Sequence, residues 1–160
     1  MFLKDALLMK RISRKKGPVV SKKVIFDGIT FASGLEKYMY KALKAAKIKF
    51  NYEYRTYELI PSFNFDNNCY ERQSNGKGDF CNRGNKKVLN LKYTPDFENE
   101  HFIIETKGRA NDSFPLRWKM FKKYLIENGD NRTLYKPQNQ KECDETVKMI
   151  LEDLKRRENI

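Results

Sequence analysis

The spacing of apolar side chains predicts three helices. The clearest case begins at Ser33, after which Leu35, Met39, Leu43 and Ala46 recur every three or four residues. Ser33 and the acid three positions later also form the Ser-x-x-Glu pattern of a capping box, which favours a helix start at this point. Two further stretches have the same amphipathic spacing. They cover residues 113–127 and about 140–156.

Short apolar or alternating stretches predict the strands. Val24 to Phe31 has Asp27-Gly28 at its centre, the dipeptide typical of a two-residue hairpin turn. Residues 64–88 are rich in Asn, Gly, Lys and Ser and predict a loop-rich insertion. The remaining strands are expected over residues 50–60, 89–97, 101–106 and 132–135. Strands interspersed with helices predict an α/β (α+β) fold, with a central mixed sheet flanked by helices in a single domain over residues 24–160.

The charge of the chain narrows the class of partner. It holds 33 Lys and Arg residues against 21 Asp and Glu, a formal net charge of +12, and such an excess attracts a polyanion such as DNA. Residues 1–23 carry eight of the basic side chains and one acid, so we expect a basic N-terminal arm. A solvated terminus explains the same composition. The arm residues expected to bind DNA are Lys10, Arg11, Arg14, Lys15 and Lys16.

Two further features of the sequence predict where in the cell the protein is located. No apolar stretch approaches the roughly 20 residues needed to cross a bilayer, so no membrane partner is expected. Three cysteines, without a recognisable secretory signal, favour free thiols in a reducing compartment. We therefore expect a cytoplasmic protein, or one in the host cytoplasm if it is phage-encoded.

The chemistry is concentrated between Tyr93 and Gly108. Side chains alternate along a strand, so Glu105 and Lys107 share one face, and a hairpin can return Asp96 beside them. Carboxylate oxygens are the ligands that Mg²⁺ or Mn²⁺ prefers, and such an ion can activate water against a phosphodiester. Lys107 could orient the water, help to deprotonate it, or neutralise charge on the transition state. The stretch predicts a metal-dependent phosphodiesterase.

These residues resemble the signature of the PD-(D/E)XK nuclease superfamily, here Pro95-Asp96 and, after a gap, Glu105-Thr106-Lys107. Four segments in this order resemble the phage endonuclease I family, which resolves Holliday junctions: Phe31-Ala-Ser-Gly-Leu-Glu36, Lys47-Ile-Lys-Phe50, Tyr52-Glu53 and Tyr93-Thr-Pro-Asp96-Phe97. The likeness covers roughly residues 31–125, apart from the insertion. The chain departs from that family at Asn51, where the family has an acid, and in the insertion itself.

The resemblance implies a restriction-endonuclease-like fold and a site in which Glu36, Asp96, Glu105 and Lys107 are catalytic. It further implies two divalent ions, a homodimer that exchanges elements, and branched DNA as the substrate. No other cofactor is expected. The expected metal ligands are the three carboxylates and the backbone carbonyl of Thr106. The basic residues expected to bind phosphates beside the cut are Arg109, Arg117 and Lys119.

Each of these residues also has a purely structural interpretation. Glu36 can complete the capping box with Ser33, Asp96 can cap a turn, and Glu105 with Lys107 can form an ion pair on a strand. Cys69, Cys81 and Cys143 could bind zinc with His101, although their spacing matches no zinc motif. Two other functions compete with the resolvase. One is a nicking or site-specific endonuclease of a mobile element or repair pathway, and the other is a non-catalytic nucleic-acid-binding protein.

Overall fold

A computed structural model of the chain describes residues 22–158. Within them lie three helices, as predicted, and the first begins at the expected cap, where the Ser33 hydroxyl accepts a hydrogen bond from the Glu36 N–H. None of these helices is long and apolar enough to span a membrane. The bounds are Gly34–Ala45 for α1, Phe114–Glu127 for α2 and Gln140–Glu158 for α3.

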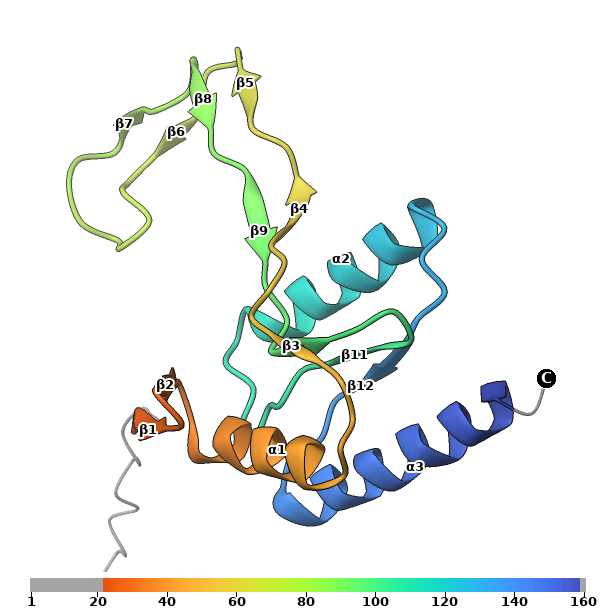
Figure 1. Cartoon of the computed structure of the whole chain (residues 1–160). Coiled ribbons are helices and arrows are strands. Elements are labelled where there is room, and N and C mark those ends of the chain that lie inside the picture. Colours follow the sequence, from red (N-terminus) through yellow and green to blue (C-terminus); the bar gives the residue numbers. More distant parts are fainter. Residues whose placement is uncertain (1–21, 159–160) are drawn as a thin grey trace, which may run out of the picture.

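A four-stranded mixed sheet forms the centre of the body, so the α+β class is confirmed. Its order is β12-β11-β10-β3, in which β11 runs antiparallel to β10 and parallel to β12. Figure 1 shows α2 on one side of this sheet, with α1 and α3 on the other. The strand bounds are Asn51–Tyr52 for β3, Phe97–Glu98 for β10, Phe102–Ile104 for β11 and Thr133–Tyr135 for β12.

The two faces of the sheet pack into two hydrophobic clusters. Strand alternation sends Ile104 and Phe97 towards α1 and α3, whereas Ile103 faces α2. All three side chains are fully buried. This packing holds β10 and β11 rigidly where the acids of the predicted site are attached.

Two predicted strands are interrupted in the structure. The expected strand 50–60 breaks after β3, where Glu53 adopts a positive φ of 43°, and resumes as β4 (Tyr57–Ile60). The expected strand 89–97 divides at Pro95 into β9 (Leu91–Tyr93) and β10. In both cases the chain leaves the central sheet, because β4 pairs with β9 instead.

The insertion predicted to be loop-rich lies outside the core, and it also contains short paired strands, which the sequence did not predict. We call residues 57–93 the arm, which Figure 1 shows projecting away from the body. Pairing continues along its length from β4–β9 through β5–β8 to β6–β7. No residue from 58 to 92 is buried, so the arm has no core of its own. The additional strands are β5 (Phe63–Phe65), β6 (Tyr70–Glu71), β7 (Cys81–Asn82) and β8 (Lys86–Val88).

The N-terminal hairpin is confirmed. β1 (Val24–Phe26) pairs with β2 (Ile29–Phe31), and Asp27 and Gly28 both have positive φ, as a type I′ turn requires. The predicted basic N-terminal segment, residues 1–23, is distinct from the arm and lies almost entirely outside the described residues. This includes Lys10, Arg11, Arg14, Lys15 and Lys16.

Candidate active site

Three acids from distant parts of the chain meet at one edge of the central sheet. Glu36 lies in the first turn of α1, Asp96 immediately before β10 and Glu105 immediately after β11. The antiparallel register pairs Phe97 with Ile104, which places Asp96 opposite Glu105. The three side chains are 7%, 9% and 6% exposed, respectively. The structure therefore brings the predicted carboxylates into one buried group.

Asp96 is the most strongly constrained of the three. Its Oδ2 accepts hydrogen bonds from the Thr106 N–H at 2.6 Å and the Thr106 hydroxyl at 2.5 Å. Oδ1 receives no hydrogen bond from a described residue. Burial raises the pKa of Asp96 well above its usual value, and the charges of Glu105 and Glu36 raise it further. A cation at Oδ1 would therefore stabilise the ionised carboxylate.

Glu105 is held between a tyrosine and a lysine. Burial raises its pKa, while the adjacent Tyr93 hydroxyl and the Lys107 ammonium lower it. The Lys107 Nζ lies 3.7 Å from Oε1 of Glu105, as expected for side chains on one strand face. The Tyr93 hydroxyl is buried next to this acid without a hydrogen bond to a described residue, so the interaction between them is electrostatic.

Lys107 is also oriented by an aromatic ring. Its Nζ lies 4.7 Å from the centroid of the Phe114 ring, at the start of α2. The side chain is 30% exposed, so the ammonium is fixed in place and still reaches solvent. This position allows Lys107 to meet both Glu105 and a substrate.

Glu36 fulfils the structural role that its spacing predicts. Its Oε1 accepts from the Ser33 hydroxyl at 3.0 Å, and its Oε2 accepts from the Ala32 N–H and the Tyr52 hydroxyl, each at 3.0 Å. The capping-box interpretation is thus confirmed. The metal-binding role of Glu36 stays a prediction.

The donor chemistry of the group fits a hard divalent ion. Mg²⁺ is commonly bound through one or two carboxylates, with water completing its shell, and Asp96 and Glu105 supply such a pair. As placed, however, no group of three or more His, Cys, Asp or Glu side chains among residues 22–158 is arranged to hold a metal ion. The backbone carbonyl of Thr106 as a ligand also stays a prediction.

A cavity of about 280 Å³ opens beside Glu105 and Lys107. Arg117, predicted to bind phosphate, lies on its wall, and the exposed side chains of Asn111 and Ser113 add hydrogen-bonding groups. Arg109 and Lys119 are exposed but do not line it. The cavity thus combines one acid with cations and polar groups, and the cations and polar groups are of the kinds that contact phosphates in protein–DNA complexes.

Three residues of the site were not predicted from the sequence. Lys92 lines the cavity, and the hydroxyls of Tyr52 and Tyr93 face Glu36 and Glu105. Tyr93 belongs to the Tyr-Thr-Pro-Asp motif, which marks it as a candidate. Tyr52 likewise belongs to the Tyr52-Glu53 pair in the resemblance, but its contact with Glu36 depends on how β3 packs against α1 and could not be predicted.

The alternative zinc site is not formed. Cys143 is buried in α3, whereas Cys69 and Cys81 flank the β6–β7 pair on the arm, well separated from α3 in Figure 1. His101 lies in the turn before β11, where its Nε2 is 3.5 Å from a Glu100 carboxylate oxygen. The cysteines therefore stay free thiols in this structure.

Comparison with known proteins places the chain in a family. Neither the curated proteins nor the solved structures gave a match. A family model described as "Protein of unknown function (DUF1064)" matches residues 17–136, three quarters of the chain. The matched segment contains Glu36, Asp96, Glu105, Lys107 and the whole arm, and it ends before α3. The chain therefore belongs to the DUF1064 family.

Proposed function

We propose that this protein is a divalent-metal-dependent endonuclease of the PD-(D/E)XK type that hydrolyses DNA phosphodiesters. The observation that carries the proposal is the burial of Glu36, Asp96 and Glu105 together, with the Lys107 ammonium 3.7 Å from Glu105. Strongly shifted pKa values cluster at functional sites, and the pKa values of both Asp96 and Glu105 are raised. The excess of basic residues adds an affinity for the DNA backbone.

The residues divide the work of hydrolysis in this proposal. Asp96 and Glu105 would hold a divalent ion, with Glu36 supporting a second, and the ion supplies Lewis-acid polarisation of the phosphate and an acidified water. Lys107 presents a positive charge at the cavity, where negative charge develops on the phosphate. Arg117 and Lys92 would bind the DNA phosphates beside the cleaved bond. Phe114 keeps the ammonium of Lys107 on the acid side of the cavity.

Branched DNA is the proposed substrate, and a homodimer is the proposed form, because the phage endonuclease I resemblance implies both. A nicking or site-specific endonuclease uses the same chemistry on another substrate. Cleavage of a four-way junction, a linear duplex and a mismatched duplex, each with Mg²⁺ or Mn²⁺, separates these activities. Preference for the four-way junction supports the resolvase.

Substitutions test the chemistry itself. Asp96→Asn and Lys107→Ala should each reduce the cleavage rate by about 100-fold or more, because the first removes a charged ligand of the proposed divalent ion and the second removes the positive charge at the reacting phosphate. Lys141→Ala is the matched control, since this side chain is 86% exposed on α3. Cleavage by either site variant at the wild-type rate would contradict the assignment of Asp96 and Lys107 to the active site.

One observation favours a second function, a non-catalytic DNA-binding protein. Both oxygens of Glu36 are already hydrogen-bonded, and no preformed metal group exists among residues 22–158. This function predicts binding to DNA that is independent of divalent ions and no cutting with any of them. The same cleavage assay, combined with binding in EDTA, decides between the two.

A further inference from the structure

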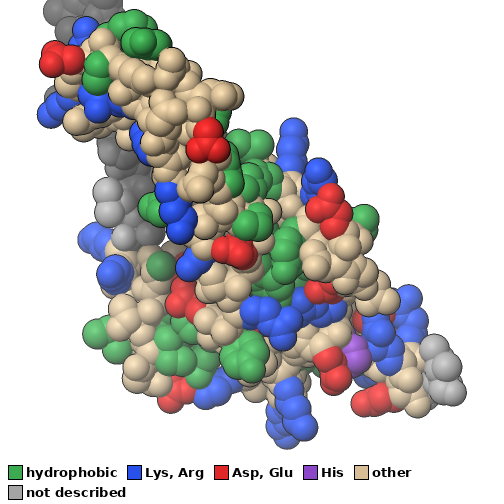
Figure 2. Space-filling view, turned by 90° about the horizontal axis from the view of Figure 1, so that it is seen from above, with side chains coloured by type: hydrophobic (Ala, Val, Ile, Leu, Met, Phe, Trp, Pro, Cys, Tyr) green, Lys and Arg blue, Asp and Glu red, His purple; other side chains and the backbone are tan. Residues whose placement is uncertain are grey.

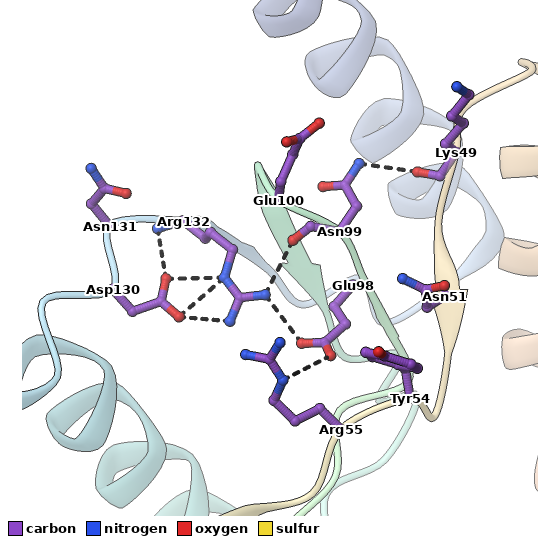
Figure 3. Close-up of a pocket in the computed structure, with 10 residues that line it drawn as sticks. All are labelled: Lys49, Asn51, Tyr54, Arg55, Glu98, Asn99, Glu100, Asp130, Asn131 and Arg132. Carbon is purple, nitrogen blue, oxygen red and sulfur yellow. Dashed lines mark hydrogen bonds and ion pairs between the residues drawn. The ribbon is translucent and has the colours of Figure 1, made fainter.

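A second and larger cavity lies at the opposite end of β10. Its volume is about 510 Å³, in the range of small-molecule sites. Figure 3 shows the Glu98 carboxylate between Arg132 on one side and Tyr54 on the other. None of the residues assigned to hydrolysis above lines this cavity. The wall consists of Lys49, Asn51, Tyr54, Arg55, Glu98, Asn99, Glu100, Asp130, Asn131 and Arg132.

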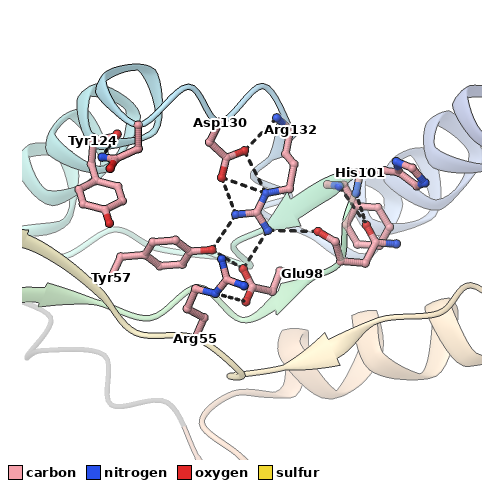
Figure 4. Close-up of polar contacts among 10 residues, drawn as sticks. Arg55, Tyr57, Glu98, His101, Tyr124, Asp130 and Arg132 are labelled. Carbon is pink, nitrogen blue, oxygen red and sulfur yellow. Dashed lines mark hydrogen bonds and ion pairs between the residues drawn. The ribbon is translucent and has the colours of Figure 1, made fainter.

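The floor of this cavity is a fixed carboxylate. Oε2 of Glu98 accepts hydrogen bonds from the Tyr57 hydroxyl at 2.5 Å and from Arg132 at 3.1 Å. The Arg132 guanidinium, 12% exposed, is itself held by Asp130 and by the backbone carbonyl of Asn99 (Figure 4). Glu98 is therefore locked in one orientation by partners that leave Oε1 unused.

Oε1 of Glu98 lacks a hydrogen bond within residues 22–158 although it is buried. The Arg55 Nε lies 3.9 Å from Oε1, beyond hydrogen-bond length. A buried acceptor without a donor costs free energy that a ligand N–H could recover. The Arg55 side chain is 57% exposed, so it can move aside at little cost.

The rim of the cavity carries the other features of a base-binding site. The Tyr54 ring is 68% exposed and can accept a stacked ring. The side chains of Asn51 and Asn131 are exposed and make no hydrogen bond to a described residue, so both amides can read the edge of a heterocycle. Among the lining residues, three bases (Lys49, Arg55, Arg132) balance three acids (Glu98, Glu100, Asp130). This balance favours a neutral group with donors and acceptors over a free ion.

We propose that this cavity binds a single unpaired nucleobase. In it, a base N–H donates to Oε1 of Glu98, the ring stacks on Tyr54, and the displaced Arg55 guanidinium meets the nucleotide phosphate. Guanine fits this arrangement best among the common bases, because its N1–H and amino group present adjacent donors. The inference rests on the proposed function, because the DNA substrate would supply the base. It also narrows the substrate to DNA that contains an unpaired nucleotide.

Binding of free nucleotides to the full chain in EDTA tests this site without any cleavage. In ligand-observed NMR, saturation should transfer from the protein to the base of GMP. IMP should bind more weakly because it lacks the amino group, and ribose 5-phosphate should bind least. Tyr54→Ala should weaken GMP binding by about tenfold or more, the usual effect of removing a stacking ring. The matched control is Tyr70→Ala, another exposed tyrosine, at the tip of the arm.

Glu98→Gln should also weaken GMP binding, and its melting temperature shows whether the variant still folds. If Glu98→Gln does not fold, the Tyr54→Ala variant still tests the proposal. Equal binding of ribose 5-phosphate and GMP, an unchanged affinity in Tyr54→Ala, or binding of an arginine-containing peptide in place of GMP would overturn the site. Absent GMP binding with intact cleavage rejects this cavity alone. GMP binding without cleavage rejects only the nuclease.

Discussion

Asp96 and Glu105 are acids whose ionised forms the fold does not fully compensate. Asp96 gains two hydrogen bonds from Thr106, and Glu105 gains the nearby Lys107 ammonium, yet burial raises the pKa of both side chains. If the site binds a cation, as proposed, these uncompensated charges would reduce the stability of the metal-free protein and favour binding of the ion. Stability measurements can therefore detect the site independently of any nuclease assay.

Asp96→Asn should stabilise the metal-free protein at neutral pH by on the order of 1 kcal/mol, because it removes a buried charge close to two others. The amide oxygen of Asn can still accept both hydrogen bonds from Thr106. Urea unfolding in EDTA measures the difference, with the exposed Asp112→Asn as control. A destabilised Asp96→Asn protein would show that the carboxylate is a structural anchor.

The same pair of proteins gives a pH dependence whose sign follows from the raised pKa of Asp96. Below the ordinary pKa of about 4 the carboxyl is protonated in both folded and unfolded chains, so Asp96 costs the fold nothing. As pH rises, the unfolded chain ionises first, and the penalty grows until pH exceeds the raised pKa. The advantage of Asp96→Asn should therefore increase as pH rises above about 4 and level off once pH exceeds the raised pKa, and Mg²⁺ should reduce it. An advantage that stays constant with pH contradicts the assignment.

At the scale of elements, periodic stretches could be predicted and the arm could not. Each of the three helices carries an apolar stripe over three or more turns. This pattern can be read from the sequence because it depends only on residues three or four positions apart. Strand alternation likewise predicted that Glu105 and Lys107 share a face. In the arm, strands of two or three residues pair across a stretch of Asn, Gly and Lys, and no apolar pattern marks their register. The site residue Tyr52 was missed because its contact with Glu36 is tertiary.

The tip of the arm depends on one close approach of the backbone. A Cβ placed on Gly84 would lie 1.9 Å from the Asn67 carbonyl oxygen and 2.7 Å from the Cys69 nitrogen. The Asn82 amide oxygen fixes the same turn by accepting from the N–H groups of Cys69 and Gly84. Any side chain at position 84 must therefore displace one strand from the other.

Gly84→Ala should open the tip of the arm and leave the body folded, because no residue from 58 to 92 belongs to the core. Limited proteolysis should cut the variant faster within residues 67–85, while its melting temperature stays close to that of the wild type. Gly34→Ala, in the first turn of α1, is the control, since nothing lies within 4 Å of its Cβ position. It should gain about 0.5 kcal/mol. Unchanged proteolysis of Gly84→Ala would mean that the tip is not ordered by this contact.

At the scale of the whole molecule, residues 1–23 hold eight basic side chains and one acid, +7 of the formal charge of +12, and the remaining +5 belongs to residues 24–160. Figure 2 shows Lys and Arg side chains over both the arm and the body, with acids between them, and no single large patch on this face. A net charge of +12 would attract DNA without selecting a sequence. In the proposed function, selection of the substrate would come from the cavities beside Glu105 and Glu98.

This excess of positive charge predicts a steep dependence of DNA binding on salt. Each phosphate neutralised by Lys or Arg contributes about −0.9 to the slope of log K against log salt concentration for duplex DNA. Replacing Lys10, Arg11, Arg14, Lys15 and Lys16 by Gln should make the slope less negative by up to about 4 if these residues contact the backbone. Fluorescence anisotropy with a labelled duplex in EDTA, between about 50 and 200 mM KCl, measures it. Asp96→Asn should keep the wild-type slope, because it removes a negative charge in the active site and no phosphate contact. An unchanged slope in the five-residue variant would place the phosphate contacts on the folded body, at residues such as Lys92 and Arg117.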